Sequence, residues 1–170
     1  MKISSAIILA VTLALAGCGD DDGQQQSDTG AQHLDGGTNL NEEGCEHLKQ
    51  GPFVDVTGGA DFKSAGEVKE DHKAYRVSIP VGAASYAKFA AGDKGDHIFF
   101  LNAAVLFEVL DDLGKTVKLE GSETSVKECT EVKGRHIVEL PAVGTYYLKF
   151  GPSAASNKVT LVIEASGHTH

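Results

Sequence analysis

The chain has 170 residues, which is enough for one domain and too short for two of full size. Hydrophobic residues make up 41% of it and charged residues 23%, so a packed core is expected and wholesale disorder is excluded. Asp and Glu total 24 against 15 Lys and Arg, a formal net charge of -9. This anionic balance argues against nucleic acid or anionic lipid headgroups as the main ligand.

The amino-terminal residues have the pattern of an export signal. Lys2 supplies a positive charge, and residues 6–16 form an apolar run that is too short for a membrane-spanning helix of about 20 residues. The sequence Leu-Ala-Gly-Cys at residues 15–18 then resembles the lipobox of bacterial lipoproteins. The resemblance implies that residues 1–17 are removed as a lipoprotein signal peptide and that the Cys18 thiol receives a diacylglycerol. An ordinary signal peptide is the alternative.

Residues 18–42 are expected to form an acylated, flexible linker, because they are rich in Asp, Gln, Gly and Ser and contain little to bury. A β-sandwich domain is expected over residues 43–166, followed by a histidine-containing tail at residues 167–170. Lipid at Cys18 would anchor the protein in a bacterial cell envelope. The lipoprotein resemblance favours the outer membrane, since Gly19 rather than Asp follows the cysteine.

Cys45 and Cys129 remain once Cys18 carries lipid. An even pair of cysteines in an exported chain predicts a disulfide bond. The alternative is that both act as thiolate metal ligands, because Cys45 and His47 are only two residues apart.

Short runs of β-branched and aromatic residues, separated by turn signals, predict an all-β fold. A short helical turn is expected only before the Gly-Pro pair at residues 51–52. The pattern favours an antiparallel β-sandwich of jelly-roll-like type. The expected strands are residues 53–57, 75–79, 97–101, 106–110, 116–119, 126–132, 136–140, 145–150 and 159–164.

Residues 71–80, 107–114 and 140–150 together are similar to the bacterial pre-peptidase C-terminal domain. This resemblance covers about residues 70–165 and implies a β-sandwich with a non-catalytic role in substrate or matrix binding. The family carries acidic residues in a central strand, whereas residues 101–105 here are Leu-Asn-Ala-Ala-Val. The family's calcium site is therefore not expected in this chain.

Histidines supply the candidate metal ligands. His47 and His136 lie two and seven residues from the two cysteines, so a disulfide would bring both close to it. On an extended segment residues i and i+2 share a face, which would point His47 the same way as Cys45. His72 stands at the entrance of a predicted strand and could join the other two at one end of the sandwich.

Neutral imidazoles that meet in this way bind copper, zinc or a haem iron, and Glu46 or Asp71 could act as a further ligand. His168 and His170 add two imidazoles in the tail. The alternative is that these histidines are surface or strand-end residues with ordinary hydrogen bonds. Both interpretations stay open at this stage.

Enzyme motifs are missing from the sequence. It contains no Gly-x-Ser-x-Gly elbow, and its Gly-rich stretches lack the strand-to-helix context of a phosphate loop, so catalysis is not expected. The first hypothesis is a lipid-anchored, non-catalytic binding or accessory module for an envelope protein or polysaccharide, without a cofactor. The second is an envelope protein that binds copper, zinc or haem through His47, His72 and His136, with His168 and His170 as recruiters of the ligand.

Overall fold

The computed structural model describes residues 39–127, 129–153 and 156–166. The expected signal peptide, the Cys18 lipidation site, most of the expected linker and the tail histidines His168 and His170 lie outside the described residues. Among the described residues, no helix has the length and apolar character needed to cross a membrane.

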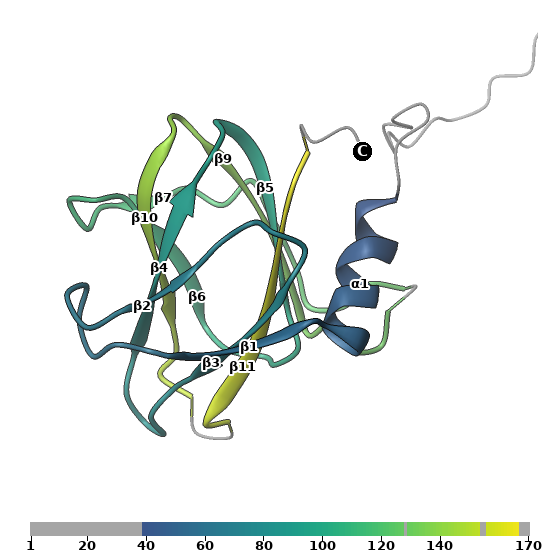
Figure 1. Cartoon of the computed structure of the whole chain (residues 1–170), viewed down its shortest axis with the longest axis horizontal. Coiled ribbons are helices and arrows are strands. Elements are labelled where there is room, and N and C mark those ends of the chain that lie inside the picture. The colour runs from purple at the N-terminus through teal and green to yellow at the C-terminus, as the bar shows by residue number, and fades with distance from the viewer. Residues whose placement is uncertain (1–38, 128, 154–155, 167–170) are drawn as a thin grey trace, which may run out of the picture. The chain divides into compact units, whose positions relative to one another are not determined.

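One helix and eleven strands make up this described part of the chain (Figure 1). In chain order they are α1 (Leu40–Gln50), β1 (Phe53–Thr57), β2 (Gly66–Val68), β3 (Ala74–Ser78), β4 (Ser85–Ala91), β5 (Gly95–Leu101), β6 (Phe107–Leu110), β7 (Thr116–Val117), β8 (Gly121–Glu123), β9 (Gly134–Leu140), β10 (Gly144–Phe150) and β11 (Lys158–Ala165).

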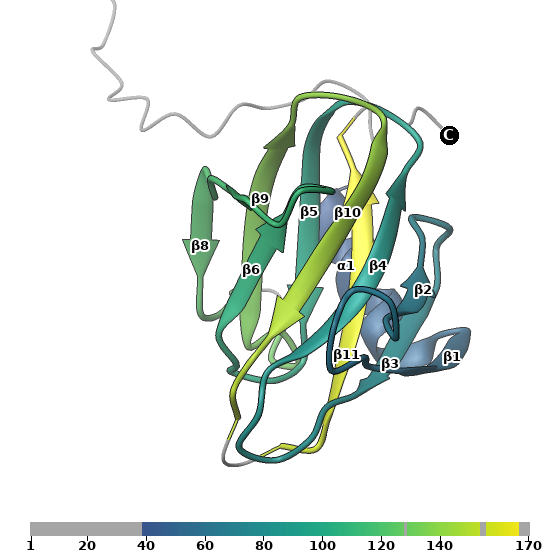
Figure 2. The ribbon, with the colours of Figure 1, turned by 90° about the vertical axis from the view of Figure 1, so that its left-hand side faces the viewer.

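The strands form two sheets that pack face to face, which confirms the predicted β-sandwich. The six-stranded sheet has the order β1-β3-β11-β5-β9-β8, and the five-stranded sheet has the order β2-β4-β10-β6-β7. Most neighbouring pairs are antiparallel, whereas β1 with β3 and β2 with β4 are parallel. Figure 2 shows β4, β10 and β6 in front of β5, β9 and β11.

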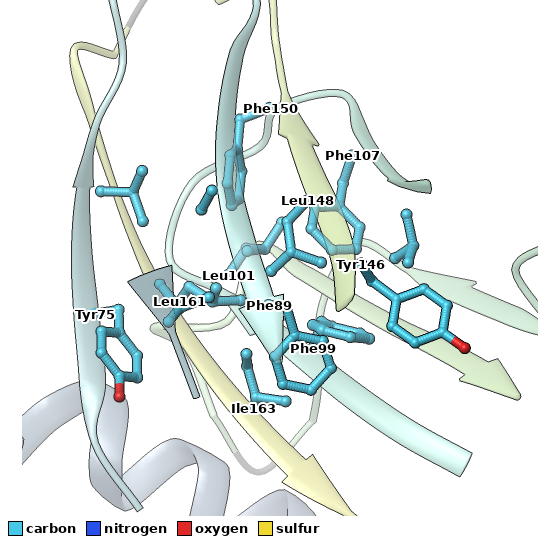
Figure 3. Packing of buried hydrophobic residues seen from close by; sticks show 14 of the residues in the cluster. Tyr75, Phe89, Phe99, Leu101, Phe107, Tyr146, Leu148, Phe150, Leu161 and Ile163 are labelled. Atoms are coloured by element: carbon cyan, nitrogen blue, oxygen red, sulfur yellow. The ribbon is translucent and has the colours of Figure 1, made fainter. Parts of the chain in front are cut away.

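The main core lies between the two sheets and follows from the alternation of each strand. In β4 the buried and partly exposed residues alternate, so that Phe89 points inward while Lys88 faces out. Phe89, Phe99 and Phe150 are fully buried between the sheets (Figure 3). Their rings and the surrounding Leu, Ile and Val side chains supply most of the buried apolar area that stabilises the sandwich.

A second, smaller core lies on the outer face of the six-stranded sheet, where α1 packs beside β5 and β11 (Figure 1). Cys45 and Leu48 of α1 are buried against Phe100 and Val162. A Cβ atom at Gly44 would lie 2.5 Å from ring carbons of Phe100, so only glycine allows the helix to come this close.

The disulfide prediction is confirmed. Cys45 in α1 is bonded to Cys129, 84 residues later in the chain, with the two Cα atoms 5.8 Å apart. The bond ties α1 to the segment of residues 126–132, which covers the same face of the sheet. A cross-link over so long a loop stabilises the fold mainly by removing freedom from the unfolded chain, by several kcal/mol in the entropic model.

Three local expectations are corrected by the structure. A full helix stands where only one helical turn was expected, and it begins at Leu40, before the domain boundary expected at residue 43. The described residues of the strand expected at 126–132 do not form one: Val126 and Cys129 make an isolated bridge, and Val126, Cys129 and Val132 pack with α1. Strands β2, β4 and β8 were not predicted, because they are short or rich in Ala, Ser, Gly and Glu rather than in strong β-formers.

Substituting Gly44→Ala tests the docking of α1. Alanine raises intrinsic helix propensity by about 1 kcal/mol, but the new methyl group collides with the Phe100 ring. We expect a net loss of about 1–3 kcal/mol in the free energy of unfolding, measured by urea denaturation. Glu46→Ala, at an exposed position of the same helix, is the control and should be close to neutral. A Gly44→Ala protein as stable as the parent would contradict this packing.

Candidate metal centre

Two imidazoles and two carboxylates converge at the edge of α1. They belong to Glu43, His47, His72 and Glu164, and one ligand atom from each lies within 4.8 Å of the others. Glu43 and His47 are four residues apart on α1, so they share one face of the helix. His72 comes from the segment between β2 and β3, and Glu164 from β11.

The pairing of β3 with β11 explains how His72 and Glu164 meet. Leu161 lies opposite Tyr75 in this antiparallel pair. Three residues further along β11 is Glu164, and three residues before Tyr75 is His72. Continuing the same register therefore places Glu164 opposite His72, just before β3 begins. Glu164 shares a face of β11 with Val162, which packs against α1. Both side chains therefore lie on the side of the sheet where the helix presents Glu43 and His47.

The contacts within the group run through the Glu43 carboxylate. His72 Nδ1 lies 3.0 Å from Glu43 Oε1 and 3.7 Å from Glu164 Oε2. His47 Nε2 lies 3.9 Å from the same Glu43 oxygen, and the two imidazole rings are 5.7 Å apart between centroids. The group is graded in exposure, since the Glu164 side chain is 4% exposed and that of His72 is 44% exposed. Solvent reaches it from the His72 side.

The tautomer of His47 is set by the end of its own helix. Its Nδ1 lies 3.2 Å from the carbonyl oxygen of Gly51, the residue that ends α1. A carbonyl oxygen only accepts hydrogen bonds, so Nδ1 carries a hydrogen, and in the neutral ring the lone pair stands on Nε2. That lone pair is on the nitrogen nearer Glu43. A backbone carbonyl that holds the second ring nitrogen is a common arrangement around metal-binding histidines.

His72 has an unusual backbone conformation. Its φ angle is 54°, the one positive value at a non-glycine residue in the described part of the chain. This left-handed conformation costs free energy at residues with a side chain, and it tends to occur where function requires it. Glycine at this position would avoid the free-energy cost of the positive φ angle. Histidine is present instead, and its imidazole points toward Glu43 and Glu164.

The Glu164 carboxyl group is almost completely buried. Burial, and then the negative charges of Glu43 and Glu70, raise the pKa of Glu164 to about 8. Its Oε1 atom is buried and has no hydrogen-bond partner among the described residues. A bound cation would satisfy this oxygen and stabilise the ionised form.

Two of the predicted histidines are brought together, and a third is not. His47 and His72 belong to the group, but His47 does so through its helix partner Glu43 and not, as expected, by sharing a face with Cys45 on an extended segment. His136 lies on β9, where its ring stacks on Phe107 at 4.9 Å and its Nδ1 lies 2.9 Å from Ser122 Oγ. Burial lowers the pKa of the His136 imidazole.

The acids predicted as further ligands lie elsewhere. Glu46 is exposed on α1, and Asp71 accepts hydrogen bonds from the Tyr75 hydroxyl at 2.7 Å and from Lys73 Nζ at 2.6 Å. The sequence reasoning missed Glu43 and Glu164, the acids that the structure places beside the imidazoles. A helix prediction would have found Glu43 from its i, i+4 spacing to His47, whereas no local signal marks Glu164.

The sulfur atoms do not form a metal site in this structure. Cys45, Cys129 and Glu131 lie close together, but the two cysteines are bonded to each other. Disulfide sulfurs lack the thiolate charge that binds metal ions. The alternative reading of Cys45 and Cys129 as thiolate ligands is therefore corrected to a disulfide.

Substituting Glu164→Gln should flatten the pH dependence of stability of the metal-free protein. The Glu164 carboxyl has a pKa of about 8 when folded, against 4.5 for an ordinary glutamate, so the unfolded state loses its proton first as pH rises. Stability should therefore fall between about pH 5 and pH 8, with a slope approaching 1.4 kcal/mol per pH unit. Urea denaturation with a chelator present measures it. Glu67→Gln, an exposed carboxylate, should keep the parental slope, and an equal slope in Glu164→Gln would contradict the assignment.

Comparison with known proteins adds no family to this description. No protein-family model matches the chain, and none of the curated proteins is similar to it in sequence. The resemblances to bacterial lipoproteins and to the pre-peptidase C-terminal domain therefore stay predictions.

Proposed function

We propose that this protein binds a divalent transition-metal ion, zinc or copper, through Glu43, His47, His72 and Glu164. The observation that carries the proposal is the convergence of two imidazoles and two carboxylates from three separate elements, with their ligand atoms within 4.8 Å of one another. Zinc accepts both histidine nitrogen and Asp or Glu oxygen as ligands and commonly takes four of them in a tetrahedral arrangement.

The charges and donor types of the group support this choice of ion. Two ionised carboxylates balance the charge of a divalent cation, and imidazole nitrogen is a preferred ligand of both zinc and copper. Calcium and magnesium take oxygen ligands almost alone, so the two imidazoles argue against them. Haem iron takes one or two axial side chains rather than four converging donors, so zinc or copper is favoured over haem.

The environment of the domain is consistent with an envelope protein. A disulfide forms and persists in oxidising compartments such as the bacterial periplasm or the cell surface. Together with the lipobox-like residues 15–18, it supports a chain that is exported and anchored through lipid on Cys18. Its non-catalytic role, and an envelope protein or polysaccharide as partner, stay predictions.

Metal titration of a full chain carrying Cys18→Ser tests the proposal. Zn²⁺ or Cu²⁺ should raise the melting temperature with one-to-one stoichiometry, corresponding to about 2.7 kcal/mol of stabilisation at 100 times the dissociation constant. His72→Gly should abolish this shift while leaving the metal-free protein as stable as the parent or more so, because glycine relieves the positive φ angle. His47→Ala and Glu164→Gln should also weaken binding.

Two controls separate this site from the other histidines. His136→Asn lies outside the group and should keep the metal-induced shift. A chain with both His168→Ala and His170→Ala should keep it too. No shift in the parent chain, or a shift lost only when the tail histidines are replaced, would rule out the proposed centre.

The lipid anchor has its own test. In the native host we expect mass spectrometry to find an amino terminus at Cys18 that carries acyl chains, and we expect Cys18→Ser to leave the membrane fraction. Two or more acyl chains bind membranes firmly because each buried methylene contributes about 0.8 kcal/mol. An uncleaved, unmodified amino terminus would contradict the anchor without affecting the metal proposal.

A further inference from the structure

A buried acid–imidazole pair lies next to the metal-binding group. Glu70 stands two residues before His72 in the same segment between β2 and β3. Its Oε2 atom lies 2.7 Å from Nε2 of His97, and the side chains of His97 and Glu70 are 1% and 10% exposed. Neither residue belongs to the group of four possible ligands.

His97 is a rigid anchor. It lies on β5, between the sheets, where its ring meets the edge of the Phe89 ring at 5.6 Å. Its Nδ1 lies 3.0 Å from the carbonyl oxygen of Gly95, which only accepts, so Nδ1 donates a hydrogen to it, and Nε2 faces the Glu70 carboxylate. Packing against Phe89 and the contact with Gly95 fix the orientation of the His97 ring independently of Glu70.

The segment that carries His72 needs such an anchor. Residues 69–73 are not part of a strand, and the backbone of His72 is in the unfavourable left-handed conformation. Strained residues persist only where their surroundings hold them. Just before His72, the Glu70 carboxylate contacts the His97 imidazole, and Asp71 accepts a hydrogen bond from the Tyr75 hydroxyl.

We propose that Glu70 and His97 are positioning residues of the metal centre. They hold the β2–β3 segment so that the His72 imidazole lies beside Glu43 and Glu164 before an ion arrives. This inference rests on the proposed metal binding. A buried acid–imidazole pair often adds little net stability, since its attraction is offset by the loss of hydration. Its contribution here is to the geometry of His72.

Glu70 has a second way to affect a bound ion, and the test must separate the two. The Glu70 carboxylate is close enough to Glu164 to raise the pKa of that residue, so its charge also reaches the centre. A positioning role requires both the contact between Glu70 and His97 and the fixed His97 side chain. A purely electrostatic effect requires only the charge of Glu70 and does not need His97.

Four variants of the Cys18→Ser chain make this distinction, with Zn²⁺ affinity measured by calorimetry. Glu70→Ala removes contact and charge, Glu70→Gln keeps a side chain able to hydrogen-bond His97, and His97→Phe removes the anchor but keeps the Glu70 charge. Glu67→Gln is the control, because it neutralises an exposed carboxylate on the neighbouring β2. Near-UV circular dichroism of the metal-free proteins reports folding, and His97→Leu, which also lacks a polar atom facing Glu70, replaces His97→Phe if the latter misfolds.

Positioning predicts that Glu70→Ala and His97→Phe bind Zn²⁺ about 10–100 times more weakly, while Glu70→Gln stays within a few-fold of the parent. With Cu²⁺ as the probe, the electron paramagnetic resonance spectra of the two weakened variants should shift toward that of His72→Gly, because one imidazole has left the ion. A fold defect alone would not produce that spectrum.

Other outcomes overturn the inference in recognisable ways. If Glu70→Gln is as weak as Glu70→Ala while His97→Phe binds normally, Glu70 acts through its charge. If all variants bind like the parent and Glu67→Gln, the pair has no part in the centre. If the parent chain itself binds no metal, the proposed function fails and the positioning role fails with it.

Discussion

The docking of α1 on the outer face of the six-stranded sheet is the contact on which the other features depend. Gly44 lets the helix reach Phe100, Leu48 and Cys45 fill the contact, and the disulfide to Cys129 fixes it from the other side. This contact buries the second face of the central strands, which explains why β11 is buried over almost its whole length. It also brings Glu43 and His47 to the edge of β11, where Glu164 and His72 lie. Without the helix, Glu164 and His72 would lie together at this edge but would lack Glu43 and His47, the other two donors.

Much of the sandwich was accessible from local patterns, and the exceptions have physical causes. Strands such as β3 and β9 alternate between buried and exposed residues, a signal that each strand carries by itself. The sequence of α1 gives only a weak helix signal, because the helix has few apolar residues. Its stability comes mainly from packing against the sheet. The segment 126–132 is the opposite case, since its sequence predicts a strand that its described residues do not form. Its valines resemble a strand but bury themselves against α1 and its disulfide.

The candidate centre shows where reasoning from one chain stops. His47 and His72 were recognisable as imidazoles near a cysteine and a strand entrance, but their acidic partners depend on information that is not local. Glu43 follows from a helical period, and Glu164 follows from the pairing of β11 with β3, which joins residues more than 80 apart. His136 was grouped with them by its distance from Cys129 along the chain. It shares a face of β9 with Val138 and Leu140, and that face turns toward the other sheet, away from α1.

The spread of the four donors along the chain has a consequence for assembly. Glu43 and His47 come early, His72 follows after β1 and β2, and Glu164 lies in the last strand. The four-donor set is therefore complete only once β11 has taken its place between β3 and β5. If the centre binds an ion as proposed, selection by all four donors would take place where the sandwich folds and not at an earlier step of the chain's synthesis.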